Sequence, residues 1–154
     1  MVISMNRIIV AILAALIVVP TVLAAGQDTS PNYMLKADEF MKGMIDNGLY
    51  LIPVSDVINA TENETEMANW VILDVRPEAG YASGHIPNSM NIPFTNIVSD
   101  IDAVPSDKKI AVVCTYDTNS AFAVAMLRVF GDRDAWVVQG GVPAWQEAGK
   151  ELVV

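Results

Sequence analysis

The sequence predicts an α/β fold with a mainly parallel sheet of about five strands flanked by helices. Short apolar runs at 70–75, 110–114 and 135–138 suit buried strands. They alternate with segments of helical character, a pattern typical of parallel strands that are covered on both faces. About 130 residues follow the N-terminal apolar segment, which is enough for one domain with its own hydrophobic core.

The first 25 residues predict export from the cytoplasm. Arg7 supplies a positive charge ahead of an apolar run at 8–19, and Val22 and Ala24 suit a signal-peptidase site. The alternative is an uncleaved membrane tether at 8–25, whose 18 residues are at the short end for a spanning helix. Both interpretations place the domain in the periplasm or extracellular space, or on the outer face of the cytoplasmic membrane.

The remaining pattern predicts a linker at 26–34 and a single domain at 35–154. The domain begins with an amphipathic helix at 35–47, and we expect its apolar face to pack in the core with Met34, Met41 and Met44. The other expected elements are strands at 49–52 and 90–92, helices at 54–60, 77–82, 119–130 and 142–148, a surface loop at 61–67 and a loose helix at 94–103.

Composition restricts the functions that the chain can have. A formal net charge of −9 argues against nucleic acid as a partner. The chain has one cysteine and one histidine, so we expect no internal disulfide, no metal site and no cofactor. Asn59 and Asn63 each begin an N-glycosylation sequon, a pattern short enough to occur by chance.

Cys114 lies where the chemistry of an α/β domain is expected, at the carboxyl end of a strand. The segment 114–120 runs from this strand into a helix that we expect Asn119 or Ser120 to cap. Backbone amides and the helix N-terminus would then favour a reactive thiolate, whereas a buried inert cysteine is the alternative. The candidate substrate-binding residues are Thr115, Tyr116, Asp117, Thr118, Asn119 and Ser120.

Ordered motifs resemble those of rhodanese domains. The first signature of that family is similar to Asp74-Val75-Arg76, Tyr81-x-x-Gly84-His85-Ile86-Pro87 and Asn91-Ile92-Pro93. The closing signature is similar to Gly140-Gly141-x-x-Ala144-Trp145-x-x-Ala148-Gly149. Cys114 falls where the family has its catalytic cysteine, and the resemblance covers roughly residues 51–152.

The resemblance implies a three-layer fold and a ping-pong sulfur transfer. Cys114 would take a sulfane sulfur from a small donor or a persulfidated protein, become a persulfide, and pass the sulfur to a thiol acceptor. Asp74, Arg76 and His85 would support the site. We expect the first two to form a structural ion pair, and the histidine to brace a turn through hydrogen bonds.

The loop after Cys114 narrows the reaction class. Related phosphatases and arsenate reductases have a longer loop with an arginine that clamps an oxyanion, whereas no Arg or Lys occurs at 115–125. Asp117 departs from the common sulfurtransferase pattern, and its charge near the sulfur would repel thiosulfate. A persulfide or polysulfide donor is therefore favoured. The alternative function is a binding or redox-sensing module with weak turnover.

A first prediction concerns processing of the N-terminus. We expect the mature protein to begin near Ala25 or Gly26, because the charged, apolar and small-residue regions follow one another in the order that signal peptidase requires. N-terminal sequencing of protein from the native host checks this. Intact Met1 in the membrane fraction would support the tether instead, and recovery from the cytosol would contradict both interpretations.

Overall fold

The computed structural model describes residues 32–154. The predicted signal peptide or anchor at 1–25, the tether at 8–25 and most of the linker at 26–34 lie outside the described residues. Within the described part, every helix is too short or too polar to cross a membrane.

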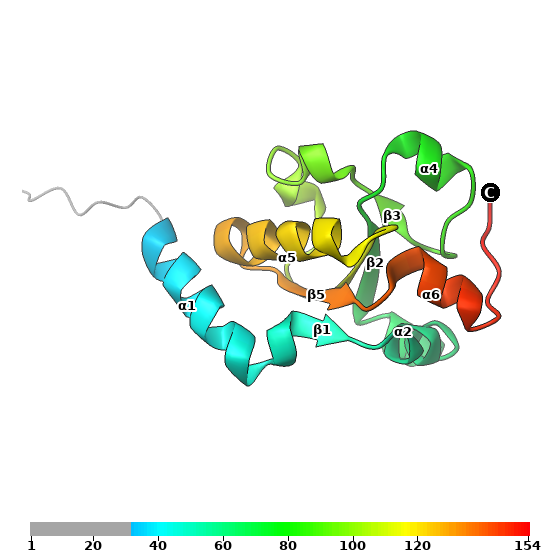
Figure 1. The fold of residues 1–154 in the computed structure, drawn as a ribbon, viewed down its shortest axis with the longest axis horizontal. Coiled ribbons are helices and arrows are strands. Elements are labelled where there is room, and N and C mark those ends of the chain that lie inside the picture. Colours follow the sequence, from blue (N-terminus) through cyan, green and yellow to red (C-terminus); the bar gives the residue numbers. More distant parts are fainter. Residues whose placement is uncertain (1–31) are drawn as a thin grey trace, which may run out of the picture. The chain divides into compact units, whose positions relative to one another are not determined.

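Five parallel strands form the sheet, which confirms the predicted fold class (Figure 1). Their order is β1-β5-β4-β2-β3, so β4 is the central strand. Each pair of neighbouring strands is parallel. The strands are β1 (Leu51–Ile52), β2 (Trp70–Asp74), β3 (Met90–Asn91), β4 (Lys109–Val113) and β5 (Asp134–Val138).

Helices and 3-10 turns connect the strands. The helices are α1 (Tyr33–Asp46), α2 (Val54–Thr61), α3 (Glu64–Met67), α4 (Glu78–Ala82), α5 (Asp117–Gly131) and α6 (Gly141–Glu147). The 3-10 turns are η1 (Gly48–Tyr50), η2 (Phe94–Asn96) and η3 (Ile101–Ala103).

Two of the expected irregular segments differ from the prediction. The expected surface loop at 61–67 contains α3, because the side chain of Asn63 accepts hydrogen bonds from the amides of Thr65 and Glu66 and starts a helical turn. The loose helix expected at 94–103 consists instead of the two separate turns η2 and η3, with a non-helical turn at 97–100 between them.

Alternation along β4 builds two cores, one on each face of the sheet. Ile110, Val112 and Cys114 face the core that α5 covers, and Ala111 and Val113 face the other. The second core includes buried side chains of α2 and α6, so the domain has three layers. Because both faces are covered, β4 is apolar along almost its whole length.

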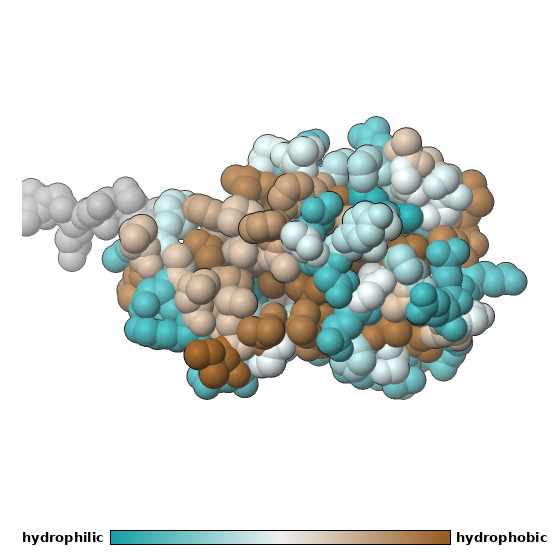
Figure 2. All heavy atoms as spheres, in the orientation of Figure 1, coloured by the Kyte–Doolittle hydropathy of each residue, from teal (hydrophilic) through white to brown (hydrophobic). Residues whose placement is uncertain are grey.

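The first helix packs differently from the prediction. No residue of α1 is buried, and Met34 and Ile45 are 82% and 83% exposed. The prediction that Met34 and Met41 pack in the core was therefore wrong, whereas Met44 does pack against the core. The reason is that α1 lies outside α5, so only one edge of its apolar face is covered. Figure 2 shows the remaining apolar side chains as a brown area over α1 and α5.

This packing generates a prediction about two isoleucines. Ile110→Ala should lower the free energy of unfolding by about 2–5 kcal/mol, because it leaves a cavity in a fully buried site. Ile45→Ala should change it by less than about 0.5 kcal/mol, because its side chain is exposed. Urea unfolding of both variants measures the difference. A cost above 2 kcal/mol for Ile45→Ala would show that α1 is part of the core.

Candidate active site

Cys114 directly follows the central strand at the carboxyl edge of the sheet. Its side chain continues the buried face formed by Ile110 and Val112, and the residue is 3% exposed. The amide Nδ2 of Asn119 donates to Cys114 Sγ at 3.7 Å. The thiol is therefore a buried group with a polar neighbour, at the edge where parallel α/β sheets bind ligands.

The helix after Cys114 begins earlier than the sequence suggested. α5 starts at Asp117 with Tyr116 as its N-cap, so the expected cap at Asn119 or Ser120 was wrong. Asn119 and Ser120 lie in the first turn of α5 instead. Asp117 is in the same turn, where its negative charge is favourable at the positive end of the helix dipole. No side chain in residues 32–154 caps this helix, so its first amides have no side-chain acceptor.

A glycine turn holds the backbone of Cys114 from the other side. The amide of Val142 donates to the carbonyl oxygen of Cys114 at 3.0 Å. Gly140 and Gly141 both have positive φ, at 71° and 53°. A Cβ on Gly141 would lie 2.0 Å from that same carbonyl oxygen, so a side chain cannot fit there.

Asp117 also contacts the glycine turn that holds Cys114. Its Oδ1 accepts a hydrogen bond from the amide of Gly140 at 2.9 Å. The carboxylate thus links the first turn of α5 to the glycine turn, a contact that the sequence pattern does not predict. The other expected binding residues Thr115, Tyr116 and Thr118 are exposed on the loop and the start of α5.

Ser120 differs from the residues around it. It is fully buried, and its Oγ has no hydrogen-bond partner among residues 32–154. A buried hydroxyl without a partner is unfavourable, so a hydrogen bond to a further group would stabilise it. It lies one residue after Asn119, whose side chain contacts the sulfur.

The expected ion pair between Asp74 and Arg76 is present and buried. Arg76 Nη2 lies 2.6 Å from Asp74 Oδ2 and also donates to the carbonyl oxygen of Gly84 at 2.8 Å. Asn91 Nδ2 donates to the carbonyl oxygens of Asp74 and Arg76 at 2.8 and 2.9 Å. These bonds hold the segment after β2 in place, and they direct the charge of Arg76 into the protein.

His85 braces a turn, as expected. Its ring stacks on Tyr81 at 3.8 Å between centroids, and its Nδ1 lies 3.1 Å from the carbonyl oxygen of Tyr81. Its backbone pairs with Val153 in an antiparallel bridge. All of these contacts are structural. Among the described residues, no group of three His, Cys, Asp or Glu side chains is arranged to hold a metal ion.

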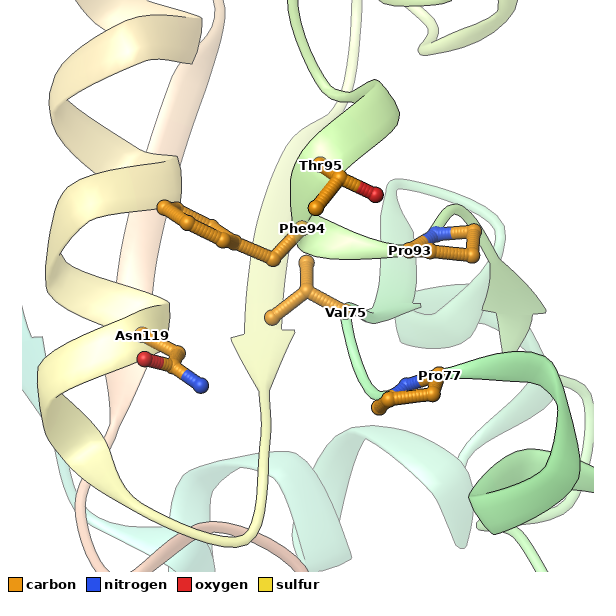
Figure 3. A pocket seen from close by; sticks show the side chains of 6 residues that line it. All are labelled: Val75, Pro77, Pro93, Phe94, Thr95 and Asn119. Carbon is orange, nitrogen blue, oxygen red and sulfur yellow. The ribbon is translucent and has the colours of Figure 1, made fainter.

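A pocket of about 180 Å³ lies beside the start of α5 (Figure 3). It is lined by Val75, Pro77, Pro93, Phe94, Thr95 and Asn119. Asn119 therefore contacts both the pocket and the sulfur of Cys114. The sequence pattern did not indicate this apolar wall, although Pro77 and Pro93 follow β2 and β3 closely enough to place them at this edge of the sheet.

The chain belongs to the rhodanese-like domain family. The family model described as Rhodanese-like domain matches residues 57–148. These residues include the ion pair after β2, the cysteine after β4 and the glycine turn before α6. The helix α1 lies outside the matched range.

Similar proteins include named sulfurtransferases. Thiosulfate sulfurtransferase GlpE of Pseudoalteromonas translucida is 34% identical over 83 residues, which cover 54% of this chain and 79% of that protein. Adenylyltransferase and sulfurtransferase UBA4 of Kluyveromyces lactis is 32% identical over 90 residues, but the chain spans only 20% of its length. A rhodanese-related protein of Thermoplasma volcanium has a similar structure, with a TM-score of 0.58 and 31% identity, covering 66% of this chain and 95% of that one.

The glycine turn generates a prediction with a matched control. Gly141→Ala should lower the free energy of unfolding by at least about 2 kcal/mol more than Gly149→Ala. Both glycines have positive φ, but a Cβ on Gly149 meets nothing within 4 Å. Urea unfolding gives the energies, and the alkylation rate of Cys114 reports displacement of the loop. Equal losses of unfolding free energy in the two variants, with an unchanged alkylation rate, would show that the turn accommodates a side chain at position 141 without displacing Cys114.

Proposed function

We propose that this protein is a sulfurtransferase that carries a sulfane sulfur as a persulfide on Cys114. The observation that carries the proposal is the placement of the only thiol beside the uncapped N-terminus of α5. Helix amides and the helix dipole stabilise negative charge on sulfur, and the thiolate is the nucleophilic form of cysteine. The sulfurtransferases among the similar proteins support the same reaction class.

The transfer proceeds in two displacements that need no oxidant. The Cys114 thiolate attacks the outer sulfur of a donor persulfide R–S–SH. A new S–S bond forms on Cys114, the donor's own S–S bond breaks, and R–S⁻ leaves with the electron pair. An acceptor thiolate then attacks the outer sulfur of Cys114–S–SH, takes it as a new persulfide, and returns Cys114 as a thiolate.

The donor is a persulfidated small thiol or protein, or a polysulfide, and thiosulfate is a poor one. The sulfonate of thiosulfate needs a cation, and the residues that line the pocket beside the start of α5 carry no charge. Arg76, the cation nearest in sequence to this pocket, is paired with Asp74. Asp117 adds a negative charge to the same loop, although Gly140 holds its carboxylate.

Ser120 and Asn119 stabilise the persulfide in this proposal. The added sulfur lies about 2.0 Å beyond Sγ and needs hydrogen-bond donors. Asn119 Nδ2 already contacts Sγ, and the unpartnered Oγ of Ser120 is the nearest buried hydroxyl along the chain. Sulfur transfer would take place outside the cytoplasm, because the sequence at 1–25 favours export.

A prediction on Cys114 and Ser120 tests this function. Cys114→Ser should abolish sulfur uptake from a persulfide donor, measured as the gain of one sulfur by intact mass. Ser120→Ala should shorten the lifetime of the loaded persulfide about fivefold, because it removes one hydrogen bond worth about 1 kcal/mol. Its free energy of unfolding should stay equal or rise, because an unsatisfied buried hydroxyl is removed.

Ser55→Ala is the matched control, because Ser55 is exposed on α2. It should change neither the lifetime nor the stability. Sulfur uptake by Cys114→Ser would contradict the proposed function. A destabilised Ser120→Ala variant with an unchanged persulfide lifetime would show that the hydroxyl is structural.

A further inference from the structure

We infer that the pocket beside Cys114 binds the organic group of the partner thiol, and that this group is compact, apolar and uncharged. The inference rests on the proposed function, because it names the class of thiol that exchanges sulfur with Cys114.

The position of the pocket supports a role in substrate binding. Asn119 joins the two places, since its Nδ2 contacts Cys114 Sγ while its side chain lines the pocket. In this inference, a thiol whose sulfur reacts at Cys114 places its organic group in the pocket on the other side of Asn119. Figure 3 shows Val75, Phe94 and Asn119 around the same space, from three different parts of the chain.

The lining defines the chemistry of the ligand. Four of its residues are apolar, namely Val75, Pro77, Pro93 and Phe94, and its polar residues Thr95 and Asn119 are neutral. A carboxylate or ammonium group placed there would lose water and gain no ion pair. The volume of about 180 Å³ is close to that of a cavity that holds one benzene ring, so an aryl or short branched alkyl group fits.

The walls of the pocket are held before any ligand arrives. The amide of Phe94 donates to the carbonyl oxygen of Val75 at 3.0 Å, which ties the two apolar walls together. The ring of Phe94 also lies 6.4 Å from that of Phe122 on α5. Pro77 and Pro93 restrict the backbone on both sides. A preformed apolar pocket selects ligands by shape with little loss of conformational entropy.

The distribution of cations supports the same selection. Lys109 lies at the start of β4, where it stacks on Trp70, and Arg133 lies just beyond the end of α5. Both residues are at the amino edge of the sheet, opposite Cys114. Arg76 at the carboxyl edge is neutralised by Asp74. An anionic thiol such as glutathione therefore finds no cation in the lining of the pocket.

The test measures how fast loaded Cys114 gives its sulfur to three thiols. Cys114 is first loaded with excess inorganic polysulfide and desalted. The acceptors are benzyl mercaptan, 2-mercaptoethanol and 3-mercaptopropionate, which separate an apolar group from an anionic one. Each rate is divided by the rate of the same thiol with a free small-molecule persulfide, which removes differences in intrinsic nucleophilicity.

Benzyl mercaptan should discharge the wild-type protein about tenfold faster than 3-mercaptopropionate after this correction, with 2-mercaptoethanol between them. Phe94→Ala should remove most of the benzyl advantage. Val98→Ala is the control, because Val98 is an exposed apolar residue outside the lining. Thr95→Lys should raise the rate with 3-mercaptopropionate, because it places a cation beside the pocket.

The outcomes distinguish this inference from the proposed function. Equal corrected rates for the three thiols, with Cys114 fully loaded, would overturn the inference and leave the sulfurtransferase function standing. A benzyl advantage that survives Phe94→Ala would also overturn it. Failure of both inorganic polysulfide and a small-molecule persulfide to load Cys114 would overturn the proposed function and this inference with it.

Discussion

The contact between the carbonyl oxygen of Cys114 and the turn Gly140–Val142 is the constraint on which the site depends. The Val142 amide holds this oxygen, and the missing side chain of Gly141 lets the two backbones approach. Asp117 adds a second bond from the start of α5 to Gly140. The end of β4, the start of α5 and the start of α6 are thereby joined at one point, so the thiol is presented from a rigid backbone.

The ion pair between Asp74 and Arg76 determines the charge available near Cys114. The buried carboxylate of Asp74 is paired with Arg76, and the bond from Arg76 to Gly84 turns the guanidinium away from solvent. Removing one partner of such a buried pair typically costs about 3–5 kcal/mol, because the other charge is then left buried and unpaired. The charge of Arg76 is therefore compensated by Asp74, and the residues that line the pocket beside Cys114 are all uncharged.

The helix α1 adds a surface that the matched family range does not include. It contacts α5 through Tyr33, whose ring lies 4.8 Å from that of Phe130, and Lys36 forms an ion pair with Asp132, the residue that follows α5. Phe40 stacks on Tyr50 at 5.3 Å. These contacts lie on one edge of the helix, which explains how an amphipathic pattern can be helical and yet leave most of its apolar residues exposed.

The sequence alone determined the fold class, the order of the five strands along the chain, and the position of Cys114 after a strand. These follow from local patterns, because apolar runs and breakers act over a few residues. The ion pair of Asp74 and Arg76 and the bracing role of His85 were also predictable, since they belong to a recognisable motif.

Tertiary structure decided what each side chain contacts. Asp117 was expected to act on the sulfur, yet its carboxylate bonds to Gly140, which lies 23 residues further along the chain. The apolar walls from Val75 and Phe94 meet Asn119 only because parallel strands bring their carboxyl ends to one edge. Met34 and Met41 have the spacing of core residues, but the placement of α1 outside α5 leaves them exposed. Hydrophobic periodicity defines a face, and only the packing of whole elements decides whether that face is covered.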